Sequence, residues 1–205
     1  MRALVLVDLQ NDFLPGGSLA VKEGDQIIPV ISDLLKKKFD LVVATKDWHP
    51  SDHGSFADSH DKTPGEIIDL FGLEQILWPV HCVQGTQGAE FAPGWDVRCI
   101  TKVFYKGTDK TMDSYSTFYD NGHRRSTGLE SYLKENGIHD IYIAGLTTDY
   151  CVKYSVLDAL KLGFNAYVVE DACKAVNLNA EDDKKALEEM RDAGAHIVRM
   201  SEITT

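Results

Sequence analysis

The sequence predicts a single α/β domain in which an open, doubly wound parallel sheet of about six strands carries helices on both faces. Three observations support this prediction. Short apolar runs rich in β-branched residues recur along the 205 residues, segments of helical period lie between several of them, and glycines stand where those helices should end. Right-handed crossovers between parallel strands then place the helices on both faces of the sheet.

The elements follow from local patterns. Apolar residues recur at helical spacing over 27–35 and 152–160, and Thr127 with Glu130 predicts a capping box at the start of another helix. Helix ends are predicted at Gly137, Gly163 and Gly194. The six segments that have the composition of buried strands are 3–9, 41–45, 100–105, 141–144, 166–169 and 196–200.

The segment 47–98 is too long for an ordinary connection inside a compact domain. It is dense in His, Gly, Pro and aromatic residues, and its only regular signal is a weak helical pattern over 67–71. Because long irregular excursions in compact domains are usually functional, we expect this segment to build part of a site within one domain spanning 1–205.

Composition limits the classes of partner. Lys and Arg number 21 against 32 Asp and Glu, and the net charge of −11 argues against a nucleic acid, because the basic runs at 36–38 and 124–125 are short. No apolar run reaches the roughly 18 residues of a membrane span, and no signal sequence precedes the first strand. With four cysteines and no CxxC pair, we expect a cytoplasmic protein. The sequence leaves a homo-oligomer open.

Three chemically active side chains follow predicted strands. Asp8 comes after the first strand, Lys106 after the third, and Cys151 after the fourth. Because ligands bind beyond the carboxyl ends of parallel strands, these side chains should converge. If Thr148 caps the next helix, its positive end and Lys106 both favour a Cys151 thiolate, and Asp8 is placed for acid-base work. Each residue alone also has a structural interpretation, as a loop cap, a surface lysine or a small buried hydrophobe.

A second group of polar residues follows the second predicted strand. Asp47 and His49 alternate on an extended segment, so both side chains point the same way and can share one metal ion. A third ligand from the long segment would leave positions open for water or substrate, and His81 and His53 are the candidates.

The sequence resembles nicotinamidases of the isochorismatase-like hydrolase superfamily nearly end to end. Carried over to this chain, the resemblance implies a catalytic triad of Asp8, Lys106 and Cys151. It also implies metal ligands at Asp47, His49 and His81, with His53 as an alternative ligand. The pieces that match, in the order of the family, are 8–13, 47–50, 78–82, 104–107, 113–116 and 148–152.

The resemblance also implies the parts of a substrate pocket. The backbone N–H groups of Thr147 and Cys151 would hold the oxyanion, with a cis peptide between Leu146 and Thr147. Similar proteins often have a smaller residue at the position of Thr147, so its side chain is a departure from the pattern. The aromatic walls for a pyridine ring fall on Phe13, Trp78 and Tyr115.

The activity that the resemblance implies is hydrolysis of nicotinamide to nicotinate and ammonia through a cysteine thioester, in NAD salvage, with deamidation of pyrazinamide as well. One divalent metal would position the ring nitrogen. Zinc is the first expectation, and iron or manganese also accept carboxylate and imidazole ligands. The alternatives are a hydrolase of the same superfamily acting on a carbamoyl compound or a vinyl ether, a metal-hydroxide amidase in which Cys151 is structural, and a non-catalytic ligand-binding protein.

Overall fold

Six strands form a parallel sheet in the order β5-β2-β1-β6-β7-β8, and each of the six predicted segments contributes one strand. The computed structural model describes residues 1–204. Most strand ends differ slightly from prediction: β1 stops before Asp8, whose φ of 50° is left-handed, and β7 continues past a bulge to pair with the end of β6. The strands are β1 Arg2–Val7, β2 Leu41–Asp47, β5 Lys102–Lys106, β6 Asp140–Leu146, β7 Asn165–Lys174 and β8 His196–Val198.

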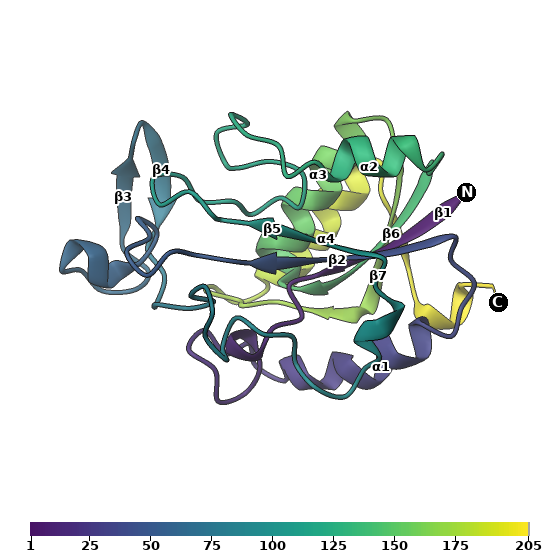
Figure 1. Cartoon of the computed structure of the whole chain (residues 1–205), viewed down its shortest axis with the longest axis horizontal. Coiled ribbons are helices and arrows are strands. Elements are labelled where there is room, and N and C mark those ends of the chain that lie inside the picture. The colour runs from purple at the N-terminus through teal and green to yellow at the C-terminus, as the bar shows by residue number, and fades with distance from the viewer. Residues whose placement is uncertain (205) are drawn as a thin grey trace.

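Helices cover both faces of the sheet, as predicted for a doubly wound fold (Figure 1). Side chains of β1 alternate between two cores: Val5 packs with α2 (Leu129–Glu135), α3 (Lys153–Lys161) and α4 (Asp182–Asp192), whereas Leu4 packs with α1 (Ile27–Leu34). Such alternation follows from the two-residue period of a strand. Short turns of 3-10 helix are η1 Asn11–Phe13, η2 Gly24–Gln26, η3 Ala57–His60, η4 Val97–Cys99 and η6 Met200–Glu202, and the π-helix η5 is Thr148–Val152.

The predictions of where helices begin and where they end have opposite outcomes. Gly137, Gly163 and Gly194 follow α2, α3 and α4 with positive φ, as predicted. The capping box of Thr127 and Glu130 is wrong. The residue before α2 is a left-handed Gly128 and not Thr127, so Glu130 is the second residue of the helix where a capping box requires the third. Its carboxylate accepts hydrogen bonds from Lys134 and Tyr119 instead.

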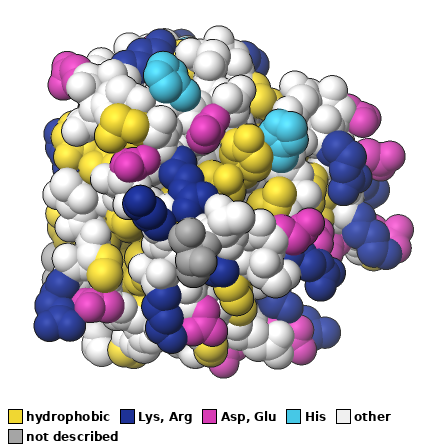
Figure 2. Space-filling view, turned by 90° about the vertical axis from the view of Figure 1, so that its right-hand side faces the viewer, with side chains coloured by type: hydrophobic (Ala, Val, Ile, Leu, Met, Phe, Trp, Pro, Cys, Tyr) yellow, Lys and Arg dark blue, Asp and Glu magenta, His cyan; other side chains and the backbone are white. Residues whose placement is uncertain are grey.

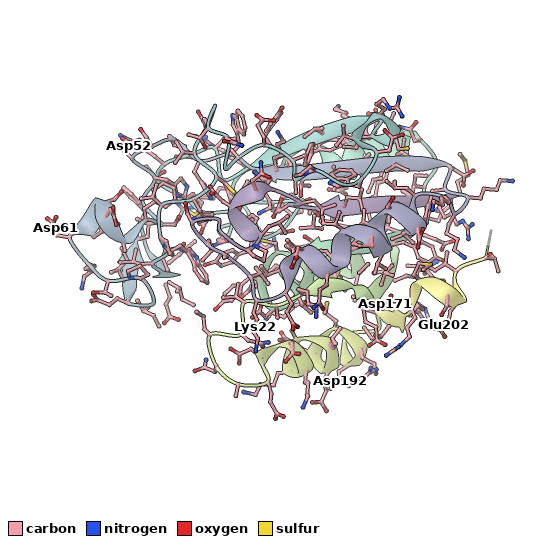
Figure 3. All side chains as sticks on the ribbon, turned by 90° about the horizontal axis from the view of Figure 1, so that it is seen from below. Lys22, Asp52, Asp61, Asp171, Asp192 and Glu202 are labelled. Atoms are coloured by element: carbon pink, nitrogen blue, oxygen red, sulfur yellow. The ribbon has the colours of Figure 1, made fainter. Side chains whose placement is uncertain are left out.

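The segment 47–98 contains a β-hairpin where a weak helical pattern was noted. Strand β3 (Ile67–Leu70) pairs with β4 (Leu73–Ile76) in an antiparallel sheet. Phe71 and Gly72 join them with φ of 52° and 89°, the left-handed pair that a two-residue hairpin turn requires. The hairpin projects from one end of the molecule (Figure 1). Seen from below, Asp61 lies at that end and Glu202, in η6, at the other (Figure 3).

The carboxyl ends of the strands meet at the edge of the sheet that faces the hairpin, where the arrowheads of β2 and β5 point in Figure 1. The opposite edge, where β1 begins, carries acidic and basic side chains interspersed (Figure 2). Within residues 1–204, no helix has the length and apolar character needed to cross a membrane. Because the carboxyl ends of the strands lie at the end of the sheet near the hairpin, the predicted side chains should meet there.

Close packing between β1 and β6 depends on Gly145. Its φ is +129°, and a Cβ there would lie 2.1 Å from the carbonyl oxygen of Val7. We predict that Gly145→Ala lowers the free energy of unfolding by about 3 kcal/mol, because both backbones must shift. Gly163→Ala is the matched control: its φ is also positive, but no atom lies within 4 Å of the added Cβ. The control should lose about 1 kcal/mol in urea unfolding, and equal losses for the two variants would contradict the packing argument.

Candidate active site

Three strand ends place a carboxylate, an ammonium and a thiol together in the interior. The side chains of Asp8 and Lys106 are fully buried, and the Lys106 Nζ lies 2.8 Å from the Asp8 Oδ2. The same Nζ lies 3.3 Å from the Cys151 Sγ and donates to the carbonyl oxygen of Ser114 at 3.0 Å. It also donates to the Asp47 Oδ1. The buried ammonium of Lys106 therefore contacts both other residues that the sequence singled out, Asp8 and Cys151.

The two oxygens of the Asp8 carboxylate have different partners. The Thr45 Oγ1 donates to the Asp8 Oδ1 at 2.7 Å. The Oδ2 forms the ion pair with Lys106, but among the described residues no donor is aligned with it as a hydrogen bond. Burial raises the pKa of Asp8 to about 6, with Lys106 opposing this rise and Asp47 adding to it. A carboxyl with this pKa can both accept and release a proton near neutral pH.

Cys151 lies in the π-helix η5, at its fourth residue. Burial raises the pKa of the Cys151 thiol well above its usual value; Lys106 opposes the rise, and the charges of Asp8 and Asp47 add to it. Thr147 precedes the helix, and no side chain caps it. The expected Thr148 cap is therefore wrong. Burial, together with the charges of Asp8 and Asp47, disfavours the Cys151 thiolate despite the nearby Lys106.

The predicted metal ligands also converge. The Asp47 Oδ2 lies 3.8 Å from both the His49 Nε2 and the His81 Nε2, and all three residues are buried. The Nδ1 atoms of His49 and His81 lie 2.9 Å and 2.8 Å from the carbonyl oxygens of Gly107 and Pro79. A carbonyl can only accept, so each Nδ1 carries the hydrogen and each Nε2 presents a lone pair to the site. One carboxylate and two imidazoles in this arrangement fit a divalent cation with open positions.

His53 lies beside this group. Its ring is buried and belongs to a second cluster with His49 and Asp113, in which the candidate ligand atoms lie within 4.8 Å of one another. The backbone N–H of Ser55 donates to the His53 Nδ1 at 3.2 Å, so the hydrogen of the neutral ring is on Nε2. That Nε2 has no hydrogen-bond partner in the described part of the chain. In this tautomer, His53 does not offer a lone pair on Nε2.

A pocket with an empty volume of about 340 Å³ opens onto these groups. Phe13, Trp78 and Tyr115, the three aromatic residues predicted as walls, all line it, together with Cys151. Further lining residues are Leu19, Asp47, His81, Asp113, Thr147, Tyr150 and Val176.

The backbone before Cys151 has the form that the resemblance implied. The peptide bond between Leu146 and Thr147 is cis. Thr147 lines the pocket, and its N–H makes no hydrogen bond among the contacts of residues 1–204. An unbonded N–H beside a thiol is available as a hydrogen-bond donor to a ligand in the pocket.

Comparison with known proteins agrees with this geometry. The sequence pattern described as the isochorismatase domain matches residues 2–202. The chain belongs to the isochorismatase family.

Three proteins named as nicotinamidases or pyrazinamidases are similar to this chain over nearly their whole length. The nicotinamidase of Escherichia coli (strain K12) is 45% identical over 204 residues, which are 98% of this chain and 96% of that protein. A solved nicotinamidase/pyrazinamidase of Acinetobacter baumannii has a TM-score of 0.94 and 45% identity, covering 98% of this chain and 97% of that one. The pyrazinamidase of Pyrococcus horikoshii, solved in complex with zinc, has a TM-score of 0.78 and 39% identity, covering 97% and 98%.

Four pocket residues of this isochorismatase family member were not predicted: Leu19, Asp113, Tyr150 and Val176. Tyr150 and Asp113 lie within motifs that the sequence analysis quoted, so proximity to Cys151 and Tyr115 was a usable signal. Leu19 and Val176 come from loops that no local pattern connects to the site. Val176 is held there because its N–H donates to the carboxylate of Asp149 at 3.0 Å.

Sequence reasoning also missed Gln10, which positions the metal group. Its buried side chain donates from Nε2 to the Asp47 carbonyl oxygen at 2.7 Å, and its Oε1 accepts from the Asp47 N–H at 2.8 Å. The side-chain amide of Gln10 therefore pairs with the backbone of Asp47 as a neighbouring strand would. It fixes the end of β2 relative to the end of β1.

Proposed function

We propose that this protein is a nicotinamidase, which hydrolyses the carboxamide of nicotinamide to nicotinate and ammonia in NAD salvage and deamidates pyrazinamide by the same route. The observation that carries the proposal is the contact of one buried ammonium with a carboxylate and with a thiol that lines an aromatic pocket. The names of the similar proteins from Escherichia coli and Acinetobacter baumannii support the substrate.

In the first half of the proposed reaction, the Cys151 Sγ attacks the carboxamide carbon while its proton passes to the Asp8 Oδ2. The electrons of the carbonyl double bond move to oxygen, where the N–H groups of Thr147 and Cys151 stabilise the charge. Asp8 then delivers its proton to the nitrogen, the carbon–nitrogen bond breaks, and ammonia leaves. The product is a thioester on Cys151. Removing one oxyanion donor in a comparable site costs about 3 kcal/mol of transition-state stabilisation.

In the second half, a water molecule replaces ammonia. Asp8 takes one proton from the water as its oxygen attacks the thioester carbon, and the carbon–sulfur bond then breaks. The proton returns from Asp8 to the Cys151 Sγ, and the product leaves as nicotinic acid, which gives its remaining acidic proton to the released ammonia and becomes nicotinate. One water is consumed and one ammonia is released, and the thiol and carboxylate are restored. Lys106 keeps its positive charge throughout and balances the negative charge on Asp8.

Asp47, His49 and His81 are the residues that would hold a divalent cation, and the zinc complex of the Pyrococcus horikoshii pyrazinamidase supports zinc ahead of iron or manganese. When bound, the cation supplies a Lewis acid that holds the ring nitrogen of the substrate. His81 is favoured over His53 as third ligand, because the lone pair on Nε2 faces Asp47 in His81 and a hydrogen occupies that atom in His53.

The first test is release of ammonia and nicotinate from nicotinamide by the purified protein. Cys151→Ala should lower turnover by at least about 10⁴-fold, because no thioester can form, while metal content is unchanged. Cys99→Ala, which changes an exposed cysteine, is the control and should retain full turnover. Absence of release by the wild type would favour the carbamoyl hydrolase or the non-catalytic protein. Metal-dependent cleavage of nicotinamide or benzamide by Cys151→Ala would favour a metal-bound hydroxide.

The pH dependence tests the role of Asp8. Because its pKa is raised to about 6, the carboxylate needed to accept the thiol proton is lost as the pH falls below that value. We therefore expect kcat/KM to fall about tenfold per pH unit below pH 6, and Asp8→Asn to lose at least about 100-fold at pH 7.5. Metal content is measured at each pH as the control. A rate that stays constant down to pH 5 with metal bound would rule out this role.

Substitution of the two candidate histidines tests the metal ligands. His81→Ala should weaken zinc binding by more than about 100-fold, measured by competition with a chelator, because a direct ligand is lost. His53→Ala is the matched variant and should change the affinity by less than about tenfold, because it removes only a neighbouring ring. Equal losses in the two variants would make His53 a ligand.

A further inference from the structure

Gln75 is a buried polar side chain that no step above uses. It lies in β4 of the hairpin and is 3% exposed, whereas its neighbour Glu74 is exposed. The Gln75 Nε2 lies 2.7 Å from the carbonyl oxygen of Ile76, 3.0 Å from the Asp113 Oδ2 and 3.2 Å from the Tyr115 hydroxyl. A buried amide is costly unless it is hydrogen-bonded. Here the two Nε2 hydrogens are shared among three acceptors, two of which, Asp113 and Tyr115, line the pocket.

The Tyr115 hydroxyl is the junction of this network. It accepts from the Gln75 Nε2 at 3.2 Å and from the Trp78 Nε1 at 3.2 Å. Burial raises the pKa of Tyr115 well above its usual value, so the phenol stays neutral. Two donors from different parts of the segment 47–98 thus converge on one oxygen, and they fix the relative position of the two rings that line the pocket.

Gln75 does not itself line the pocket, whereas Tyr115, Trp78 and Asp113 do. It also lies outside the cluster of Asp8, Lys106 and Cys151, whose contacts do not include it. Any effect of Gln75 on a bound ring must therefore be transmitted by the pocket residues Tyr115, Trp78 or Asp113.

We propose that Gln75 is a positioning residue that fixes the hairpin to Tyr115 and, through its hydroxyl, sets the aromatic walls that bind the pyridine carboxamide. This proposal rests on the proposed function for the identity of the ligand. It assigns a role in binding to the hairpin, whose residues Ile67 and Phe71 are exposed and whose Leu70 is buried.

The expected signature separates binding from chemistry. Gln75→Met keeps the length of the side chain but removes both donors, so Tyr115 keeps only the Trp78 donor and Asp113 loses its amide partner. We expect KM for nicotinamide to rise about tenfold, the loss of about one net hydrogen bond, while kcat stays within about twofold. Glu74→Gln, on the same strand but exposed, is the control and should change neither constant.

A double-mutant cycle tests whether the effect passes through the Tyr115 hydroxyl. Tyr115→Phe removes the same junction from the other side. If the two residues act together, Gln75→Met should add less than about twofold to KM in the Tyr115→Phe background. Additive increases, or a fall in kcat with KM unchanged, would overturn the proposal. Gln75→Asn, whose shorter amide does not reach Tyr115, replaces Gln75→Met if that variant does not fold.

A spectroscopic measurement keeps the proposal testable if the wild type releases no ammonia. The chain has three tryptophans, each with one indole N–H signal in a ¹H–¹⁵N spectrum, and Trp78→Phe identifies the signal of Trp78. Gln75→Met should shift that signal and leave those of Trp48 and Trp95 in place. An unmoved Trp78 signal would show that Gln75 is only structural, whereas a shift without any activity would overturn the proposed function alone.

Discussion

The site is organised around the buried ammonium of Lys106. Burying an isolated charge is very costly, and this one is compensated by two carboxylates, a carbonyl oxygen and a thiol. Its partners come from the ends of β1 and β2, the loop after β5 and the helix after β6. The parallel sheet is therefore a means of bringing four chain segments to one cation. Removing the Lys106 ammonium would leave Asp8 and Asp47 as two buried charges of the same sign without this partner. The site and the local fold therefore both depend on Lys106.

Burial and the two carboxylates also limit how far Lys106 can favour a Cys151 thiolate. A lysine beside a cysteine favours the thiolate when its charge is not already neutralised. Here two carboxylates compete for it, and burial penalises a third negative charge. The residues that the sequence identified do converge, but a lysine beside the cysteine is not enough by itself to favour the thiolate.

Periodicity predicted the sheet because the signals for its six strands are local: a buried strand is apolar wherever it pairs. The rule that parallel strands end at one edge then predicted the meeting of Asp8, Lys106 and Cys151. The hairpin was missed because Ile67, Ile68 and Leu70 fit a short helix as well as a strand, and the Phe71-Gly72 turn decides between them. The contributions of Leu19 and Val176 depend on contacts between loops distant in sequence, which no local pattern encodes. The tautomer of His53 was equally hidden, because it follows from a hydrogen bond with Ser55.

The two hydrogen bonds between Gln10 and Asp47 make the site sensitive to the length of the loop that carries Gln10. A side-chain amide that takes the place of a strand residue sets the distance between two loops by its own length. The run from Asp8 to Gln10 therefore acts as a spacer of fixed length, with Leu9 buried between its two polar ends. Insertion or deletion of one residue in this run would displace the carboxylate near the thiol and the carboxylate near the imidazoles together. The length of this run therefore sets the positions of Asp8 and Asp47 at the same time.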